Sequence, residues 1–157
     1  MLADAGAIFI GQGIAADGVA TFADFADVPA DQKIEFPVAE ELNVGVAIGM
    51  SLAGLLPVVS LPRMDFLLRA MDQIVNHLDK LEEMSVGQFR PKVIIRVRVG
   101  KRTPLDAGPQ HTGRYTEAFR LMLKNMDVEE IERPDHIMPA YTFALRSPYP
   151  SLVVEAF

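Results

Sequence analysis

The sequence predicts an α/β protein with a three-layer, doubly wound, mainly parallel sheet and helices on both faces. Short buried runs rich in valine and isoleucine alternate with segments of helical period, which is typical of parallel sheets. The connections between most of these segments are short. The chain has 157 residues, of which 50% are hydrophobic and 23% charged, so we expect a single domain over residues 1–157.

The first half of the chain contains two predicted strands and a helix rich in small residues. Residues 7–10 form an apolar run that ends at Gly11-Gln12-Gly13, as expected for a buried strand that enters a loop. The mixed segment 12–34 is long for a loop in a compact domain, and such loops are often functional. A short strand over residues 34–36 ends at Pro37, and a helix is expected over residues 39–55.

The second half continues the alternation of strands and helices. Residues 64–84 repeat apolar side chains at i, i+3, i+4 and i+7, which predicts one long amphipathic helix. A loop punctuated by glycine and proline is expected at 100–113. The other predicted elements are strands at 57–61, 92–99, 128–131 and 151–155, and helices at 114–124 and 137–146.

Composition excludes several classes of function. The net charge of −6 argues against a nucleic-acid partner. The absence of cysteine excludes disulfides, zinc–thiolate sites and thiol nucleophiles, and it fits a cytoplasmic protein. The first ten residues lack the basic region and the apolar length of a signal peptide, and no stretch approaches the roughly 18 apolar residues of a membrane span.

Ligands of doubly wound sheets bind beyond the carboxyl ends of the strands. The loops at 11–34 and 100–113 both follow predicted strands, and the helix that carries Glu40 begins at the same end. Glu40 lies in the first turn of a helix that is otherwise almost free of charge, where a carboxylate is a candidate for contact with a cofactor ring. The alternative is that Glu40, like Glu41, merely complements the helix macrodipole.

Two other side chains are candidates for chemistry. His111 lies in the loop Gly108-Pro-Gln-His-Thr-Gly113 and could transfer protons, or it could be an ordinary loop histidine. Phe66 lies outside the apolar stripe of its helix, and it could stack on a planar ligand or simply pack against a neighbouring segment. Lys101 and Arg102 could meet an anionic substrate, although solvated loop charges are commoner.

Signatures of phosphate and metal binding are missing. There is no Gly-x-Gly-x-x-Gly motif between strand and helix, no P-loop, no Gly-x-Ser-x-Gly elbow and no histidine-rich cluster. We therefore expect no metal site within this chain.

The chain resembles the pyrimidine-binding domain of thiamine-diphosphate enzymes, with the β subunit of 2-oxo-acid dehydrogenase E1 components as the nearer likeness and transketolase as the more distant one. The resemblance extends over nearly the whole chain. It is carried by Pro37-x-x-Glu40, Gly45-Val-Ala-Ile-Gly49-x-x-x-Ala-Gly54-x-x-Pro57, Ala70-x-Asp72-Gln73-Ile-x-Asn76, Met84-Ser85, Gln110-His111 and Leu152-Val-Val-Glu155.

The resemblance implies a role for each candidate residue. Glu40 would hydrogen-bond the aminopyrimidine ring of thiamine diphosphate and so promote deprotonation of the thiazolium ring, which then serves as the electron sink. Phe66 would stack on the pyrimidine, and His111 would handle protons or orient the substrate. Gln12 would lie near the cofactor, at a place where the family often has an acid.

The departures from the family imply that the chain needs a partner. Nothing matches the Gly-Asp-Gly…Asn motif that holds the diphosphate and magnesium, so both are expected on a diphosphate-binding chain. The resemblance implies a homodimer docked on that chain, with Gly45 and Gly49 on the face that makes close helix contact. Pro62-Arg63 replaces residues that are usually more apolar, which changes the shape of the neighbouring pocket.

The predicted function is therefore the pyrimidine half of a split enzyme for 2-oxo-acid decarboxylation and acyl transfer, or for ketol transfer on a ketose. The E1-like pattern favours the first reaction. Two alternatives stay open. One is a non-catalytic paralogue that acts as a structural or regulatory partner, which the change at Gln12 and the missing domains favour. The other is an unrelated α/β binding module.

Overall fold

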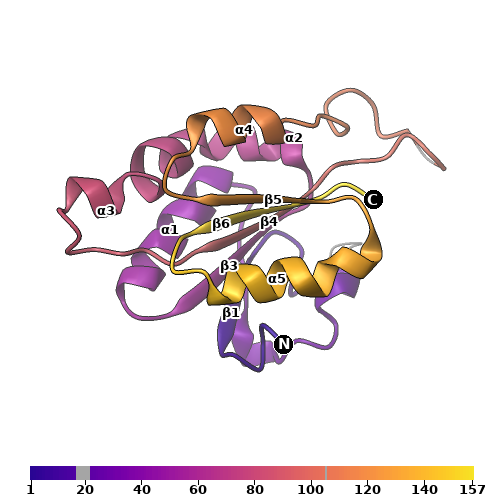
Figure 1. The fold of residues 1–157 in the computed structure, drawn as a ribbon. Coiled ribbons are helices and arrows are strands. Elements are labelled where there is room, and N and C mark those ends of the chain that lie inside the picture. Colours follow the sequence, from indigo (N-terminus) through magenta and orange to yellow (C-terminus); the bar gives the residue numbers. More distant parts are fainter. Residues whose placement is uncertain (17–21, 105) are drawn as a thin grey trace.

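The computed structural model describes residues 1–16, 22–104 and 106–157. Its centre is a six-stranded sheet in which every paired strand is parallel, with the strand order β2-β1-β3-β4-β6-β5 (Figure 1). The predicted fold class is confirmed. The strands are β1 Ala7–Gly11, β2 Lys33–Glu35, β3 Leu56–Leu61, β4 Ile94–Arg98, β5 Asp127–Ile131 and β6 Ser151–Glu155.

Helices cover both faces of the sheet, as parallel strands require because their two faces are apolar. One face carries α1, α2, the segment that continues from α2, and α4, whereas α5 lies across the other (Figure 1). The helices are α1 Glu40–Leu52, α2 Met64–Leu67, α3 Leu81–Met84, α4 Thr116–Met122 and α5 Ile137–Arg146, with short helical segments η1 Phe22–Phe25, η2 Ala30–Gln32, η3 Leu68–Ala70, η4 Asp72–Leu78 and η5 Pro134–His136.

The two faces of the sheet follow from the period of two along each strand. In β4, Ile95 and Val97 are fully buried under α1, α2 and α4, whereas Ile94 is buried on the side of α5. Arg96 falls on the α5 side of the sheet, where an apolar residue would be expected. The charged side chain of Arg96 therefore lies between the sheet and α5.

The prediction of one continuous helix over residues 64–84 is wrong, because the hydrogen-bonding pattern changes along this segment. The chain follows a helical path, but it passes through α2, the 3₁₀ segment η3 and the π-helical segment η4 before a break at Asp79 and Lys80 and a last turn in α3. Asp79 is 2% exposed, and its Oδ1 accepts the backbone N–H groups of Lys124 and Asn125, both at 2.8 Å. The tertiary contacts of Asp79 fix the end of η4 against the loop before β5. A periodic pattern of apolar residues cannot specify that contact.

The other predicted elements lie within a few residues of the observed ones, and residues 137–146 and 151–155 coincide with α5 and β6. The long segment after β1 contains η1 and η2, and β2 begins at Lys33, one residue before the prediction. Part of that segment, residues 17–21, lies outside the described residues. In the part of the chain that the structure describes, no helix is long and apolar enough to cross a membrane.

Candidate active site

Glu40 is the first residue of α1 and follows β2 by a short link, so it lies at the carboxyl edge of the sheet. Its side chain is half-buried, and it makes no hydrogen bond or ion pair with any described residue. The helix behind it buries Val44, Ala47 and Ile48 in the core. A half-buried carboxylate without a partner in the described chain is available to bind a ligand.

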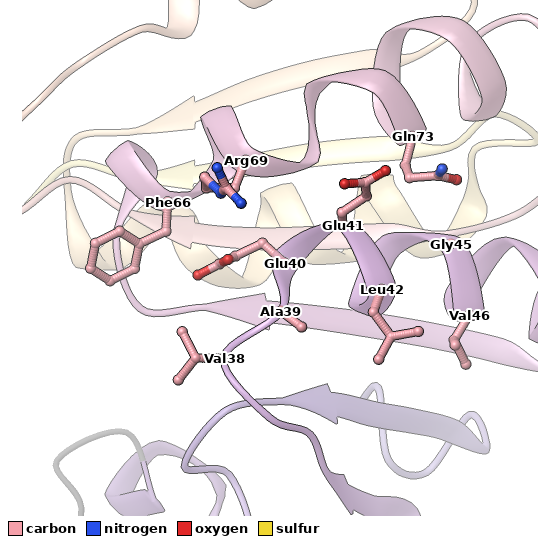
Figure 2. A pocket seen from close by; sticks show the side chains of 10 residues that line it. All are labelled: Val38, Ala39, Glu40, Glu41, Leu42, Gly45, Val46, Phe66, Arg69 and Gln73. Atoms are coloured by element: carbon pink, nitrogen blue, oxygen red, sulfur yellow. The ribbon is translucent and has the colours of Figure 1, made fainter.

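A hollow of about 880 Å³ opens in front of Glu40, between the start of α1 and the segment that begins with α2. Figure 2 shows the Glu40 carboxylate extending toward the side where the Phe66 ring lies, whereas Glu41 points toward Gln73. The neighbouring glutamates therefore differ in direction. The lining residues are Val38, Ala39, Glu40, Glu41, Leu42, Gly45, Val46, Phe66, Arg69 and Gln73.

The lining of this hollow suits a flat, largely apolar ring with one polar edge. Aliphatic side chains and the Phe66 ring offer faces for van der Waals and stacking contact. Glu40 supplies a carboxyl group that can share a proton with a ring nitrogen, and Arg69 and Gln73 supply further polar groups at the rim. An aminopyrimidine ring has the matching chemistry, so the residues present fit the pyrimidine half of thiamine diphosphate.

The side-chain rings of Phe66 and His111 are in edge-to-face contact. Phe66 lies in α2, directly after β3, and its ring centroid is 5.4 Å from that of His111 at an interplanar angle of 79°. His111 itself is not among the residues that line the hollow. It lies in the loop that follows β4 and contacts Phe66 through its ring.

The His111 loop is held in place at both of its ends. A side chain at Gly100 would bring Cβ to 1.8 Å from the carbonyl oxygen of His111, so only glycine allows the two backbone segments to pass this closely. At the other end, the carboxylate of Asp65 accepts the backbone N–H of Gly113 at 3.1 and 3.2 Å. Asp65 precedes Phe66, so the same turn of α2 fixes the aromatic ring and the loop that carries the histidine.

The other predicted site residues have different surroundings. Gln12 is half-buried after β1, but it does not line the hollow. Gly45 lines the hollow, and a Cβ there would lie 3.3 Å from Oε1 of Gln73 within the same chain. Gly49 is exposed, and a Cβ there would meet nothing within 4 Å. The close approach at Gly45 is therefore made within the chain, and only Gly49 leaves open space for an outside partner.

Sequence reasoning missed several residues of the hollow. Arg69 and Gln73 lie three and seven positions after Phe66, which is the spacing of one helical face. That spacing could have placed them beside Phe66. Val38 and Leu42 are also exposed there, and their position depends on the turn between β2 and α1, which no periodic pattern describes.

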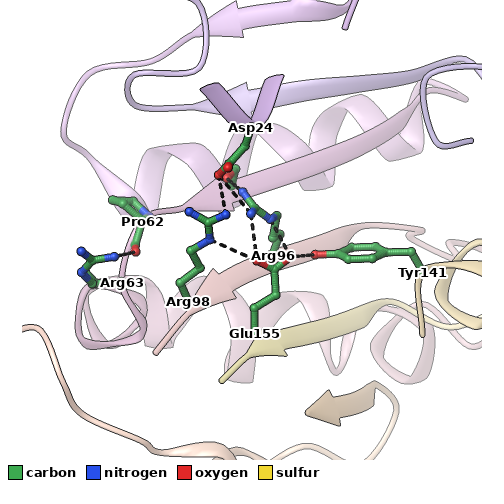
Figure 3. Close-up of polar contacts among 8 residues, drawn as sticks. Asp24, Pro62, Arg63, Arg96, Arg98, Tyr141 and Glu155 are labelled. Atoms are coloured by element: carbon green, nitrogen blue, oxygen red, sulfur yellow. Dashed lines mark hydrogen bonds and ion pairs between the residues drawn. The ribbon is translucent and has the colours of Figure 1, made fainter. Parts of the chain in front are cut away.

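A second group of charges lies at the ends of β4 and β6, on the α5 side of the sheet. The carboxylate of Glu155 accepts hydrogen bonds from Arg96 Nε at 2.9 Å, Arg96 Nη2 at 2.8 Å, Arg98 Nε at 3.1 Å and the Tyr141 hydroxyl at 2.8 Å (Figure 3). Asp24 of η1 also pairs with both arginines. The network therefore ties the segment after β1 to the ends of two central strands.

The positive charges of the two arginines in this network are matched by the negative charges of Asp24 and Glu155. Burial raises the pKa of Glu155, but the hydrogen bonds and charge of Arg96 outweigh it and hold that pKa below its ordinary value. Burial and the neighbouring Glu155 charge raise the pKa of Tyr141 well above 10, so Tyr141 stays a hydrogen-bond donor. The network is thus a neutralised structural element, with Glu155 ionised at neutral pH.

The described residues contain no group of three or more histidine or acidic side chains that could hold a metal ion.

Comparison with protein families identifies the chain: the model for "Transketolase, pyrimidine binding domain" matches residues 1–156. The chain belongs to this family. It is a pyrimidine-binding domain of the thiamine-diphosphate type, and its fold is the one that the sequence predicts.

Relatives of this domain include E1 β subunits. The chain is 31% identical over 122 residues to the pyruvate dehydrogenase E1 component subunit beta of Rickettsia bellii, which covers 78% of this chain and 37% of the relative. It is 37% identical over 87 residues to the corresponding subunit of Cyanidium caldarium, covering 55% of this chain and 26% of the relative. The chain thus spans well under half the length of the relatives it matches.

Solved structures with the same fold include transketolases. A split gene transketolase described as an inactive beta4 tetramer superposes with a TM-score of 0.74 at 19% identity, covering 98% of this chain and 45% of that one. The transketolase of Campylobacter jejuni gives a TM-score of 0.76 at 16% identity, covering 98% of this chain and 23% of that one. At such identities the likeness concerns the fold alone. The roles of Glu40, Phe66, His111 and Gln12 stay predictions.

Proposed function

We propose that this domain is the pyrimidine-binding half of a split thiamine-diphosphate enzyme and that Glu40 activates the cofactor. The observation that carries the proposal is the half-buried Glu40 carboxylate, which has no partner among the described residues and faces a hollow walled by Phe66. When bound, thiamine diphosphate supplies the electron sink for cleavage next to a carbonyl group. The protein's own contribution is to hold and polarise the pyrimidine ring.

The residues of the hollow divide this work. The Glu40 carboxyl would share a proton with a ring nitrogen of the pyrimidine. Phe66 would pack against the ring and fix its orientation. The ring of His111 contacts that of Phe66, with 5.4 Å between the ring centroids, and in this proposal His111 handles protons or orients the substrate.

A second chain completes the site in this proposal. Holding a diphosphate requires a cation and donors of a kind that the sequence motifs of this chain do not supply. The neighbouring fold of a split gene transketolase, described as inactive as a beta4 tetramer, supports a division of the active site between chains. We propose a homodimer of this chain bound to a diphosphate-binding chain, with the open face at Gly49 as one contact surface.

The proposed reaction is decarboxylation of a 2-oxo acid with acyl transfer, because the sequence relatives are E1 β subunits. Ketol transfer between sugars is the competing reaction, and the transketolase structures that share the fold support it. A non-catalytic partner is the other competing function. In favour of it, Gln12 stands where the resemblance leads one to expect an acid, and it does not line the hollow.

The decisive experiment compares Glu40→Gln with Glu41→Gln. The two glutamates are neighbours at the start of α1, so both changes remove one charge from the same helix end, but only Glu40 points toward Phe66. With the diphosphate-binding chain, thiamine diphosphate, magnesium and a 2-oxo acid, we expect Glu40→Gln to lower kcat by about 10²–10⁴-fold, as for loss of a proton-transfer group. Glu41→Gln should stay within about twofold of the unchanged protein.

Equal activity of the two variants would show that Glu40 has no special role. Activity toward a ketose and not toward a 2-oxo acid would replace decarboxylation by ketol transfer. No turnover by the assembled complex with either substrate would favour the non-catalytic alternative. Calorimetry gives an independent check, because the chain alone should bind thiamine diphosphate weakly, and tight binding would exclude the split site.

A further inference from the structure

A second pocket of about 430 Å³ lies at the carboxyl ends of β4 and β6, and it shares no lining residue with the hollow at Glu40. Three of its lining residues are cationic and one is acidic. The loop after β4 and Phe157 form the remaining wall. The lining residues are Arg63, Arg98, Val99, Gly100, Lys101, Thr103, Pro104, Ala107, Glu155 and Phe157.

Two of the charged residues in this pocket neutralise each other. Arg98 Nε donates to Glu155 at 3.1 Å, and Arg98 Nη2 lies 2.7 Å from the Asp24 carboxylate. Arg96 pairs with the same two acids, so two arginines face two carboxylates and their charges cancel. The acid in the pocket wall is therefore compensated by its own partners, and it does not neutralise the remaining cations.

Arg63 and Lys101 have no ion pair with any residue that the structure describes. The Arg63 guanidinium has five N–H donors, and its one hydrogen bond within residues 1–16, 22–104 and 106–157 runs from Nη1 to the carbonyl oxygen of Pro62 at 2.9 Å. Its Nε is buried and finds no hydrogen-bond partner in those ranges. Figure 3 shows Arg63 bonded to Pro62 alone, apart from the contacts that join Arg96, Arg98, Asp24, Glu155 and Tyr141.

The position of Arg63 is fixed by its packing. An ideal Cβ on Gly100 would lie 3.4 Å from Arg63 Cδ, so the aliphatic stem lies against the glycine at the mouth of the loop. Leaving donors of a partly buried guanidinium unmatched costs free energy, because they lose hydrogen bonds to water and gain none from the protein. A group that accepts these hydrogen bonds and carries negative charge would remove that cost.

We propose that the pocket between Arg63 and Lys101 binds a small oxyanion, either a phosphate group or a carboxylate. The planar guanidinium of Arg63 matches the two oxygens of such a group, and Lys101 adds a second positive charge from the facing loop. Since the whole chain has a net charge of −6, binding of an anion here depends on this local arrangement and not on the overall charge.

Inorganic phosphate and acetate, titrated separately into the full chain at constant ionic strength, test the proposal. Binding is followed by calorimetry and by the shifts of backbone amide signals of Gly100 and Lys101. We expect saturable binding of at least one anion, weakened at least tenfold by Arg63→Met and several-fold by Lys101→Ala. Arg63→Lys should also bind more weakly than the unchanged chain, because it keeps the charge and loses the planar pair of donors.

Arg90→Met is the matched control, since it removes an equal charge from an exposed arginine that is paired with Glu82 and precedes β4, whereas the pocket lies at the carboxyl end of that strand. It should bind like the unchanged chain. The anion that binds more tightly identifies the ligand as phosphate-like or carboxylate-like. Absence of saturable binding by both anions, or equal weakening by Arg63→Met and Arg90→Met, would overturn the proposal. If Arg63→Met does not fold, unchanged binding by Lys101→Ala, in an exposed loop, would also overturn it. These readouts need neither thiamine diphosphate nor turnover.

Discussion

Replacement of Glu155 by alanine should destabilise the chain by about 3–5 kcal/mol, the range for removing one partner of a buried ion pair. Glu155 is 7% exposed, and its carboxylate accepts four hydrogen bonds from Arg96, Arg98 and Tyr141. Alanine would leave Arg96, whose side chain is 11% exposed, with Asp24 at 3.1 Å and the Ser60 hydroxyl at 3.4 Å as its polar contacts in the described structure. The buried hydroxyl of Tyr141 would lose its acceptor.

The same network predicts a dependence of stability on pH. Because the pKa of Glu155 in the folded chain lies below its ordinary value of 4.5, the unfolded chain binds more protons than the folded chain near that pH. The stabilisation is therefore complete above about pH 5 and is lost as the pH falls through the folded pKa of Glu155. Glu155→Gln does not titrate, so its unfolding free energy should fall less steeply with acid.

Urea unfolding followed by circular dichroism, from pH 7 down to pH 3, measures both effects. A double variant, Arg96→Met with Glu155→Leu, should recover much of the stability lost in Glu155→Ala, since it leaves no buried charge unpaired. A loss of less than about 1 kcal/mol in Glu155→Ala at pH 7, or identical pH profiles for the unchanged chain and Glu155→Gln, would refute this account of the network.

Two further predictions concern single contacts. Gly100→Ala should cost about 1–3 kcal/mol in urea unfolding, because its Cβ would overlap the His111 carbonyl oxygen, whereas Gly49→Ala should be neutral or gain up to about 1 kcal/mol since its Cβ meets nothing within 4 Å. Equal effects of the two changes would contradict the close approach at Gly100. Asp79→Ala should lower the free energy of unfolding by about 2 kcal/mol or more, because two backbone N–H groups of the loop before β5 would lose their acceptor. Asp79→Asn keeps an acceptor and should lower it clearly less. A larger loss in Asp79→Asn than in Asp79→Ala would refute the role of Asp79.

Much of the fold was predictable because its elements carry local signals. The strand at 151–155 is apolar and bounded by Pro150, and the helix at 137–146 has a strong helical period, so both are found where the sequence predicts them. The helix predicted at 64–84 shows where such signals fail. Over segments this short, apolar residues at i, i+3 and i+4 are compatible with 3₁₀, α and π hydrogen bonding alike, although the three helix types differ in residues per turn. Packing against α1 and the contacts of Asp79 accompany the hydrogen bonding that the structure shows.

The sequence allowed individual residues of the candidate site to be predicted, but not how these residues are arranged in space. Glu40 and Phe66 come from helices that follow different strands, and the structure places both in one hollow. The sequence led us to expect Gly45 and Gly49 on one interface, which stays a prediction; the structure adds that a Cβ at Gly45 would lie 3.3 Å from Gln73 Oε1 of the same chain. Which side chain fills the space at a glycine depends on how two helices cross, and single-helix patterns carry no such information.

By itself, the sequence determined the class of fold, the order of most elements and the family, because hydrophobic period, turn residues and short motifs are properties of local stretches. The tertiary structure alone decided that Glu40 points toward Phe66 while Glu41 does not, that Gly100 lies under His111, and that Arg63 is left with open donors beside a neutralised Arg98. These features depend on distances between segments far apart in the chain. Such distances are set by packing of the two layers on the sheet, which no local pattern encodes.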